Sequence, residues 1–132
     1  MNRANFLLHG QHDPPRAPVA LRAGPLSLLY EPGSGFLRRI MLGQREVLRG
    51  IYAAVRDRNW GTVPGQVREI RRDAGPDGFR IEFESAHCQG GIHFVWRGTI
   101  RGEPAGVLRY ESDGEARTAF LRNRIGLCVL HP

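Results

Sequence analysis

The stretch GFRIEFES, residues 78–85, decides the fold class of this chain. Its apolar residues Phe79, Ile81 and Phe83 alternate with charged residues, so one face of an extended segment is apolar and the other is charged. This period of two is typical of a half-buried antiparallel strand, because successive side chains of a strand point to opposite faces of the sheet. The sequence therefore predicts a strand here, with its apolar face in a core.

The segments that follow extend this pattern into a meander. GIHFVWRGTI, residues 91–100, alternates in the same way, with Phe94 and Trp96 on its apolar face. Further along, Asp113-Gly114 separates two more extended runs, and this dipeptide favours the positive φ angles of a two-residue hairpin turn. We therefore expect a hairpin centred on these two residues, within a meander that runs from about residue 66 to residue 123.

Short runs of the same kind occupy the rest of the chain. They are LSLLYE (26–31), FLRRIML (36–42), REVLRGIYAAVRD (45–57), QVREIRRD (66–73) and IGLCVLH (125–131). Turn clusters such as PGSG, residues 32–35, separate them, and helical periodicity is weak throughout. Nine or ten short strands at this spacing predict an all-β fold, an antiparallel two-sheet β-sandwich with little or no helix.

Length and composition are those of one globular domain. The chain has 132 residues, of which 41% are hydrophobic and 24% charged. Residues 1–20 are rich in proline and predict an irregular N-terminal arm, which leaves residues 21–132 as the β-sandwich domain. No apolar run reaches the roughly 20 residues that cross a bilayer, and the N-terminus lacks a signal-peptide core. We therefore expect no membrane partner and a cytoplasmic location.

The charge of the chain is strongly basic but scattered. The formal net charge is +6, and all nineteen basic residues are arginine. Most of them alternate with apolar residues, which places them on the solvent face of strands rather than in one basic patch. The pattern favours a solvated arginine-rich surface over a nucleic-acid interface.

The sequence contains no complete catalytic or metal-ligating pattern. His87, Cys88 and His93 are close in sequence, but adjacent residues of a strand point to opposite faces, which argues against a chelating pair. No serine lies in a G-x-S-x-G context, and the carboxylates alternate with apolar residues as on a solvated face. Cys88 and Cys128 lie far apart and are expected to be reduced thiols. The sequence thus predicts no catalytic residues, no metal and no cofactor.

Two polar clusters interrupt otherwise apolar surroundings. The first comprises Arg56, Asp57, Arg58, Asn59 and Trp60, and the second comprises Arg122, Asn123 and Arg124, which break two apolar strands. One interpretation is a structural network at a sheet corner, with Asp57 accepting hydrogen bonds from Arg122 or Arg124. The other is a surface that binds a sugar or carboxylate, with Trp60 as a stacking platform. Both hold if the corner faces a neighbouring domain.

Long strings of this sequence resemble a known family. They are GPLSLLYEPG (24–33), RRIMLGQREVLRGIYAAVRDRNWGTVP (38–64), HFVWRGTI (93–100) and DGEARTAFLRNRIGLCVLHP (113–132). From about Leu21 to Pro132 the chain is similar to the N-terminal part of the D-apionate lactonase family. Its members are sugar-acid lactone hydrolases of the bacterial catabolism of the branched pentose apiose.

The resemblance implies a role within a longer enzyme. Members of that family continue into a glycoside-hydrolase-like barrel and further β structure, so this chain is expected to be an N-terminal β-sandwich fragment that is inactive alone. None of the family's catalytic residues transfers onto these positions. The expected partner is the C-terminal barrel domain, or a second copy through the apolar edge at residues 125–130.

Two alternatives remain open at this point. The chain is either the accessory sandwich of a lactonase-like enzyme or a freestanding β-sandwich module that binds a carbohydrate or another protein. Half of a galactose-mutarotase-like sandwich is one form that the predicted fold can take.

Overall fold

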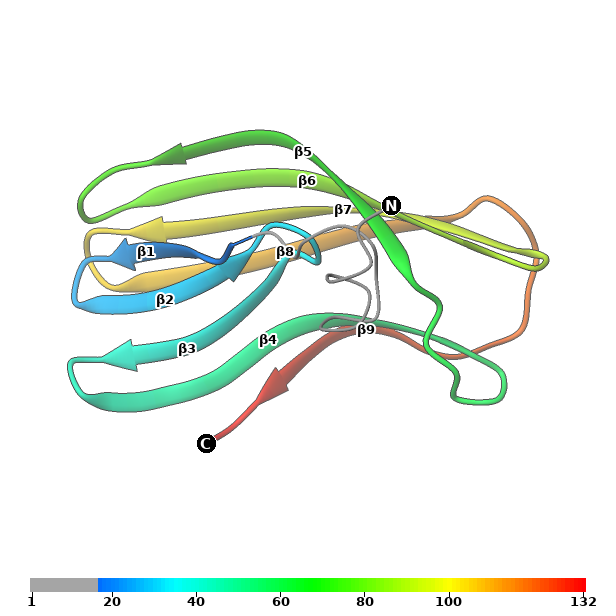
Figure 1. Cartoon of the computed structure of the whole chain (residues 1–132), viewed down its shortest axis with the longest axis horizontal. Coiled ribbons are helices and arrows are strands. Elements are labelled where there is room, and N and C mark those ends of the chain that lie inside the picture. Colours follow the sequence, from blue (N-terminus) through cyan, green and yellow to red (C-terminus); the bar gives the residue numbers. More distant parts are fainter. Residues whose placement is uncertain (1–16) are drawn as a thin grey trace, which may run out of the picture.

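The computed structural model describes residues 17–132, which form two antiparallel sheets that pack as a β-sandwich (Figure 1). One sheet has the strand order β1-β2-β3-β4-β9 and the other the order β5-β6-β7-β8. The strands are β1 (Val19–Ala23), β2 (Leu26–Glu31), β3 (Phe36–Leu42), β4 (Arg45–Asp57), β5 (Gly65–Ala74), β6 (Phe79–Gln89), β7 (Ile92–Glu103), β8 (Val107–Ala116) and β9 (Arg122–Leu130). The prediction of an all-β, two-sheet sandwich is confirmed, and the described residues contain no helix.

The four-stranded sheet is the predicted meander, but it ends at Ala116 and not near residue 123, because residues 122–130 form β9 in the other sheet. Phe79, Ile81 and Phe83 of β6 are all buried, as their alternation indicated. Phe83 lies edge-on to Trp96 of β7, with 5.1 Å between the ring centroids. The alternating apolar face therefore forms one wall of the core, as the sequence predicted.

The predicted hairpin at Asp113-Gly114 is wrong. Both residues lie inside β8, where Gly114 is opposite Trp96 of β7. A Cβ atom on Gly114 would lie 2.3 Å from Cζ of Phe94, so the glycine is needed for close packing and not for a turn. β8 continues to Ala116, and the chain then crosses to the other sheet before β9 begins.

The β-sandwich begins slightly before the predicted end of the N-terminal arm at residue 20. β1 begins at Val19 and pairs with β2, so the last residues of the predicted arm belong to the sandwich. The rest of the arm, residues 1–16, lies outside the described residues. Within residues 17–132, no helix is long and apolar enough to cross a membrane.

The turn between β2 and β3 ties the two sheets together. Gly35 adopts a φ of 74°, and a Cβ atom there would lie 2.4 Å from the Phe83 ring of the opposite sheet. Tyr110 of β8 donates its hydroxyl to the carbonyl oxygen of Gly35 at 2.7 Å. Burial raises the pKa of Tyr110, so its hydroxyl remains a donor. The glycine-rich PGSG segment is thus a turn, as predicted, and its backbone is held against the core.

Candidate functional site

A buried polar network lies on the inner face of β6 and β7. Ser85 and His87 continue the buried face of β6, with exposed fractions of 2% and 7%. Nδ1 of His87 donates to the carbonyl oxygen of Val63 at 2.8 Å. Its Nε2 accepts from Nε1 of Trp96 at 2.9 Å and from Oγ of Ser85 at 3.0 Å. One neutral tautomer satisfies all three bonds, and burial lowers the pKa of His87 and so favours that neutral form.

The serine–histidine contact in this network has only part of the geometry of a nucleophile. A serine hydroxyl bonded to a neutral imidazole is the contact that activates serine in hydrolases. Here Trp96 shares the accepting nitrogen, and the other nitrogen of His87 donates to the peptide of Val63 rather than to a carboxylate. The lowered pKa also makes His87 a weaker base. The bonds instead anchor the segment that enters β5 to the face of β6.

The sequence patterns did not predict that Ser85, His87 and Trp96 meet. The signal that could have found them is the alternation of β6, because Ser85 and His87 lie two and four residues after Phe83 and so share its face. Trp96 lies opposite Ser85 in β7. Extending the period of two through residue 87 would have placed both polar groups inside the core.

A cleft of about 550 Å³ opens between the two sheets where β4 and β9 face β7 and β8. Phe94, Trp96 and Phe120 supply aromatic surface, while glycines and alanines from both sheets leave the space unfilled. The polar groups of Ser112 and Arg122 also line it. Its volume falls in the range of small-molecule sites, about 300–1,000 Å³. It can therefore receive a small ligand or the side chains of another polypeptide segment.

The first predicted cluster forms a local turn after β4. The carboxylate of Asp57 accepts hydrogen bonds from the backbone N–H groups of Asn59 at 2.8 Å and Gly61 at 2.9 Å. Arg56 donates to Oγ1 of Thr62 at 2.6 Å. Trp60 has a φ of 67° and is 60% exposed. Asp57 thus organises its own turn, which presents Trp60 to solvent together with Arg58 and Asn59, both exposed.

The second cluster lies beside the first. Arg122 is opposite Asp57 in the β4–β9 ladder, and the guanidinium of Arg124 lies 5.9 Å from the centroid of the Trp60 ring. Arg122, Asn123 and Arg124 begin β9 and do not break a strand, contrary to the sequence interpretation. The ion pairs of residues 17–132 include none between Asp57 and either arginine. The clusters therefore meet through strand pairing and a cation–π contact.

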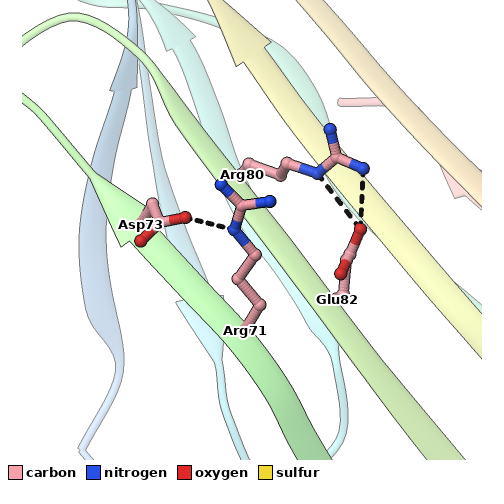
Figure 2. A network of polar contacts seen from close by, with 4 residues as sticks. All are labelled: Arg71, Asp73, Arg80 and Glu82. Atoms are coloured by element: carbon pink, nitrogen blue, oxygen red, sulfur yellow. Dashed lines mark hydrogen bonds and ion pairs between the residues drawn. The ribbon is translucent and has the colours of Figure 1, made fainter.

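Most other surface arginines have a carboxylate beside them. On β5 and β6, Arg71 pairs with Asp73, and Arg80 donates to Glu82 at 2.7 and 3.1 Å (Figure 2). The hydrogen bond from Arg80 lowers the pKa of Glu82. Nine such pairs occur in the described part of the chain, each with a different arginine. The outer surface is therefore a mosaic of opposite charges.

The cysteines and histidines of residues 17–132 do not gather into a ligand set. His87 is buried and Cys88 exposed, so the two point to opposite faces of β6, as predicted. Both Cys88 and Cys128 are free thiols. Across residues 17–132, no group of three or more His, Cys, Asp or Glu side chains is placed to hold a metal ion.

Comparison with known proteins places this domain in a larger context. A family model described as "D-apionate lactonase, N-terminal domain" matches residues 6–132. A D-apionate lactonase of Brucella anthropi is 34% identical over 129 residues, which cover 96% of this chain but 21% of that protein. No solved structure matches the chain.

Proposed function

The chain belongs to the D-apionate lactonase N-terminal domain family, and we propose that it is the accessory N-terminal β-sandwich of a sugar-acid lactone hydrolase. One observation carries the proposal. The similarity to the Brucella anthropi lactonase extends over almost the whole chain, yet the chain spans only about a fifth of that protein's length. The catalytic residues then belong to the rest of the longer polypeptide, and this domain packs against that part as an accessory domain.

The geometry of the polar groups supports an accessory role. Asp57 is engaged by the backbone of its own turn, and the contact between Ser85 and His87 is buried and shared with Trp96. The two polar clusters instead form an exposed corner around Trp60 and Arg124. An exposed tryptophan under an arginine is typical of surfaces that pack against another protein. We assign this corner to contact with the rest of the enzyme.

A lactone-hydrolysis assay tests the proposal. The isolated 132-residue chain should not hydrolyse the lactone of D-apionate. A chimera in which it replaces the matched N-terminal region of the Brucella anthropi lactonase should be active, whereas the same enzyme without any N-terminal domain should lose stability or turnover. Turnover by the isolated chain that Asp57→Ala abolishes would contradict the accessory role.

A second candidate function is suggested by the cleft between the sheets. Its volume of about 550 Å³ and its aromatic lining suit a carbohydrate-binding module. In that case titration with sugar acids and neutral pentoses should give saturable heat, and Phe120→Ala should weaken it. Absence of binding together with an active chimera favours the accessory domain.

We also propose a cytoplasmic location. Both cysteines are free thiols, and the reducing conditions of the cytoplasm keep such thiols unpaired. Fractionation of a bacterial host that expresses the full-length protein tests this: the protein should appear with cytoplasmic markers, and recovery from the periplasm would contradict the proposal.

A further inference from the structure

The edge of β9 differs from the other three sheet edges of the described structure. Sheet edges are usually protected from pairing by charges, bulges or shortness. β1 has five residues, while β5 and β8 are lined with arginines and carboxylates. In β9 the six residues from Ile125 to Leu130 carry no charge, and the strand pairs on one side only, with β4. The unprotected edge is therefore confined to β9.

The inner face of β9 is covered only in part. Val129 lies opposite Ile51 in the β4–β9 ladder, so the two side chains share the core-facing side of the sheet. Ile51 is 9% exposed, but Val129 is 48% exposed. The core that covers β4 thus reaches Ile125 of β9 but not Val129 at the other end of the strand. The cleft between the sheets opens on the same side, where Ile125 of β9 lines it.

We infer that β9 pairs with an additional β-strand that comes from the part of the lactonase polypeptide outside this domain. The inference rests on the proposed function. That strand would satisfy the free backbone groups of β9, and its apolar side chains would cover Val129 and extend over the mouth of the cleft.

The source of the strand follows from length and charge. The chain spans 21% of the Brucella anthropi lactonase, so most of such a polypeptide is left to provide a partner strand. A second copy fits less well, because each copy carries a formal charge of +6 and has Arg122 and Arg124 on the pairing strand itself.

Hydrogen–deuterium exchange tests this inference directly. Peptides covering residues 122–130 are compared in the isolated chain and in the chimera with the remaining part of the Brucella anthropi lactonase. Exchange in these peptides should slow by roughly tenfold or more in the chimera, because their outward amides become bonded. Peptides of β5, residues 65–74, serve as the internal control for a charged edge and should change little.

Two matched variants show whether pairing at the β9 edge causes the protection. Val129→Lys places a charge on the proposed pairing edge, and Val107→Lys places one on the edge strand β8 at a similar exposure, 41% against 48%. Val129→Lys should reverse the protection of β9 in the chimera, and Val107→Lys should not. Unchanged exchange in β4 peptides verifies that both variants are folded.

The outcomes separate this inference from the proposed function. Equal exchange of β9 in the isolated chain and in an active chimera overturns the inference and leaves the accessory role intact. Slowed exchange in a chimera that does not hydrolyse the lactone supports the strand pairing and contradicts the accessory role. Concentration-dependent dimerisation of the isolated chain, with β9 protected in the dimer, overturns the assignment of the partner.

Discussion

Trp96 donates its indole N–H to Nε2 of His87 across a distance of 2.9 Å, and this bond joins β7 to β6 inside the core. The other nitrogen of His87 holds the carbonyl oxygen of Val63, at the end of the long connection from one sheet to the other. A single buried imidazole therefore links two strands of one sheet and the segment that arrives from the opposite sheet. Four predictions concern this His87 network, which comprises Ser85, His87, Trp96 and the carbonyl of Val63, and the turn after β4.

Trp96→Phe should weaken the His87 network but keep an aromatic ring beside Phe83. The substitution removes the indole donor, and Nε2 of His87 retains only Ser85 as a partner. We expect the free energy of unfolding to fall by about 1–3 kcal/mol, from the lost hydrogen bond and the smaller ring. Trp60→Phe, at an exposed position, is the control and should change the stability little. Urea denaturation measures both, and equal losses would contradict the role of the bond.

The stability of the domain should decrease in mild acid. Burial lowers the pKa of His87 below the ordinary histidine value of about 6.5, so the unfolded state takes up a proton before the folded state does. The contribution of His87 is therefore complete above about pH 6.5 and is lost as the pH falls toward its folded pKa. Thermal unfolding from pH 5 to 8 should show this slope. His87→Gln should flatten the profile, whereas His131→Gln, at the exposed end of the chain, should not.

Gly65→Ala should destabilise the domain because the new methyl group would collide with the side chains of His87 and Ser85. A Cβ atom at Gly65 would lie 2.5 Å from Cε1 of His87 and 2.6 Å from Oγ of Ser85. We expect a loss of about 1–3 kcal/mol, typical of overpacking. Gly91→Ala is the matched control, since no atom lies within 4 Å of a Cβ built there. If both variants have the same melting temperature, the space around the His87 ring is not filled as described.

Asp57→Ala should destabilise the turn after β4 independently of β9. The carboxylate accepts two backbone hydrogen bonds, so we expect a loss of about 1–3 kcal/mol. A double-mutant cycle with Arg122→Ala should give a coupling energy below about 0.5 kcal/mol, because Asp57 forms no ion pair with Arg122. A coupling above about 1 kcal/mol would restore the corner ion pair that the sequence suggested.

The elements that the sequence predicted well are those whose signal is local. The alternation of Phe79, Ile81 and Phe83 identifies β6, because a strand with one buried face must repeat every two residues. The dipeptide Asp113-Gly114 gave a wrong prediction because the role of its glycine depends on a contact with another strand. Its glycine satisfies a packing requirement set by Phe94 on the neighbouring strand, and sequence spacing carries no trace of that contact.

The candidate site was predicted only in part. The sequence identified both polar clusters, and strand pairing does bring Asp57 beside Arg122. It did not indicate that Asp57 would bond to the backbone of its own turn, in which Trp60 adopts a positive φ. Nor did it reveal the cleft, whose walls come from strands of both sheets.

The sequence by itself determined the fold class, the meander and the resemblance to one family, because periodicity and long strings of residues can be read along the chain. Tertiary structure alone decided which polar groups meet. His87, Ser85, Trp96 and Val63 come from separate segments and are joined only when the sheets close. The open edge of β9 is likewise a property of sheet order, since β4 is its one neighbour among the strands of residues 17–132. Contacts between distant segments depend on the whole packed structure, and no local pattern encodes them.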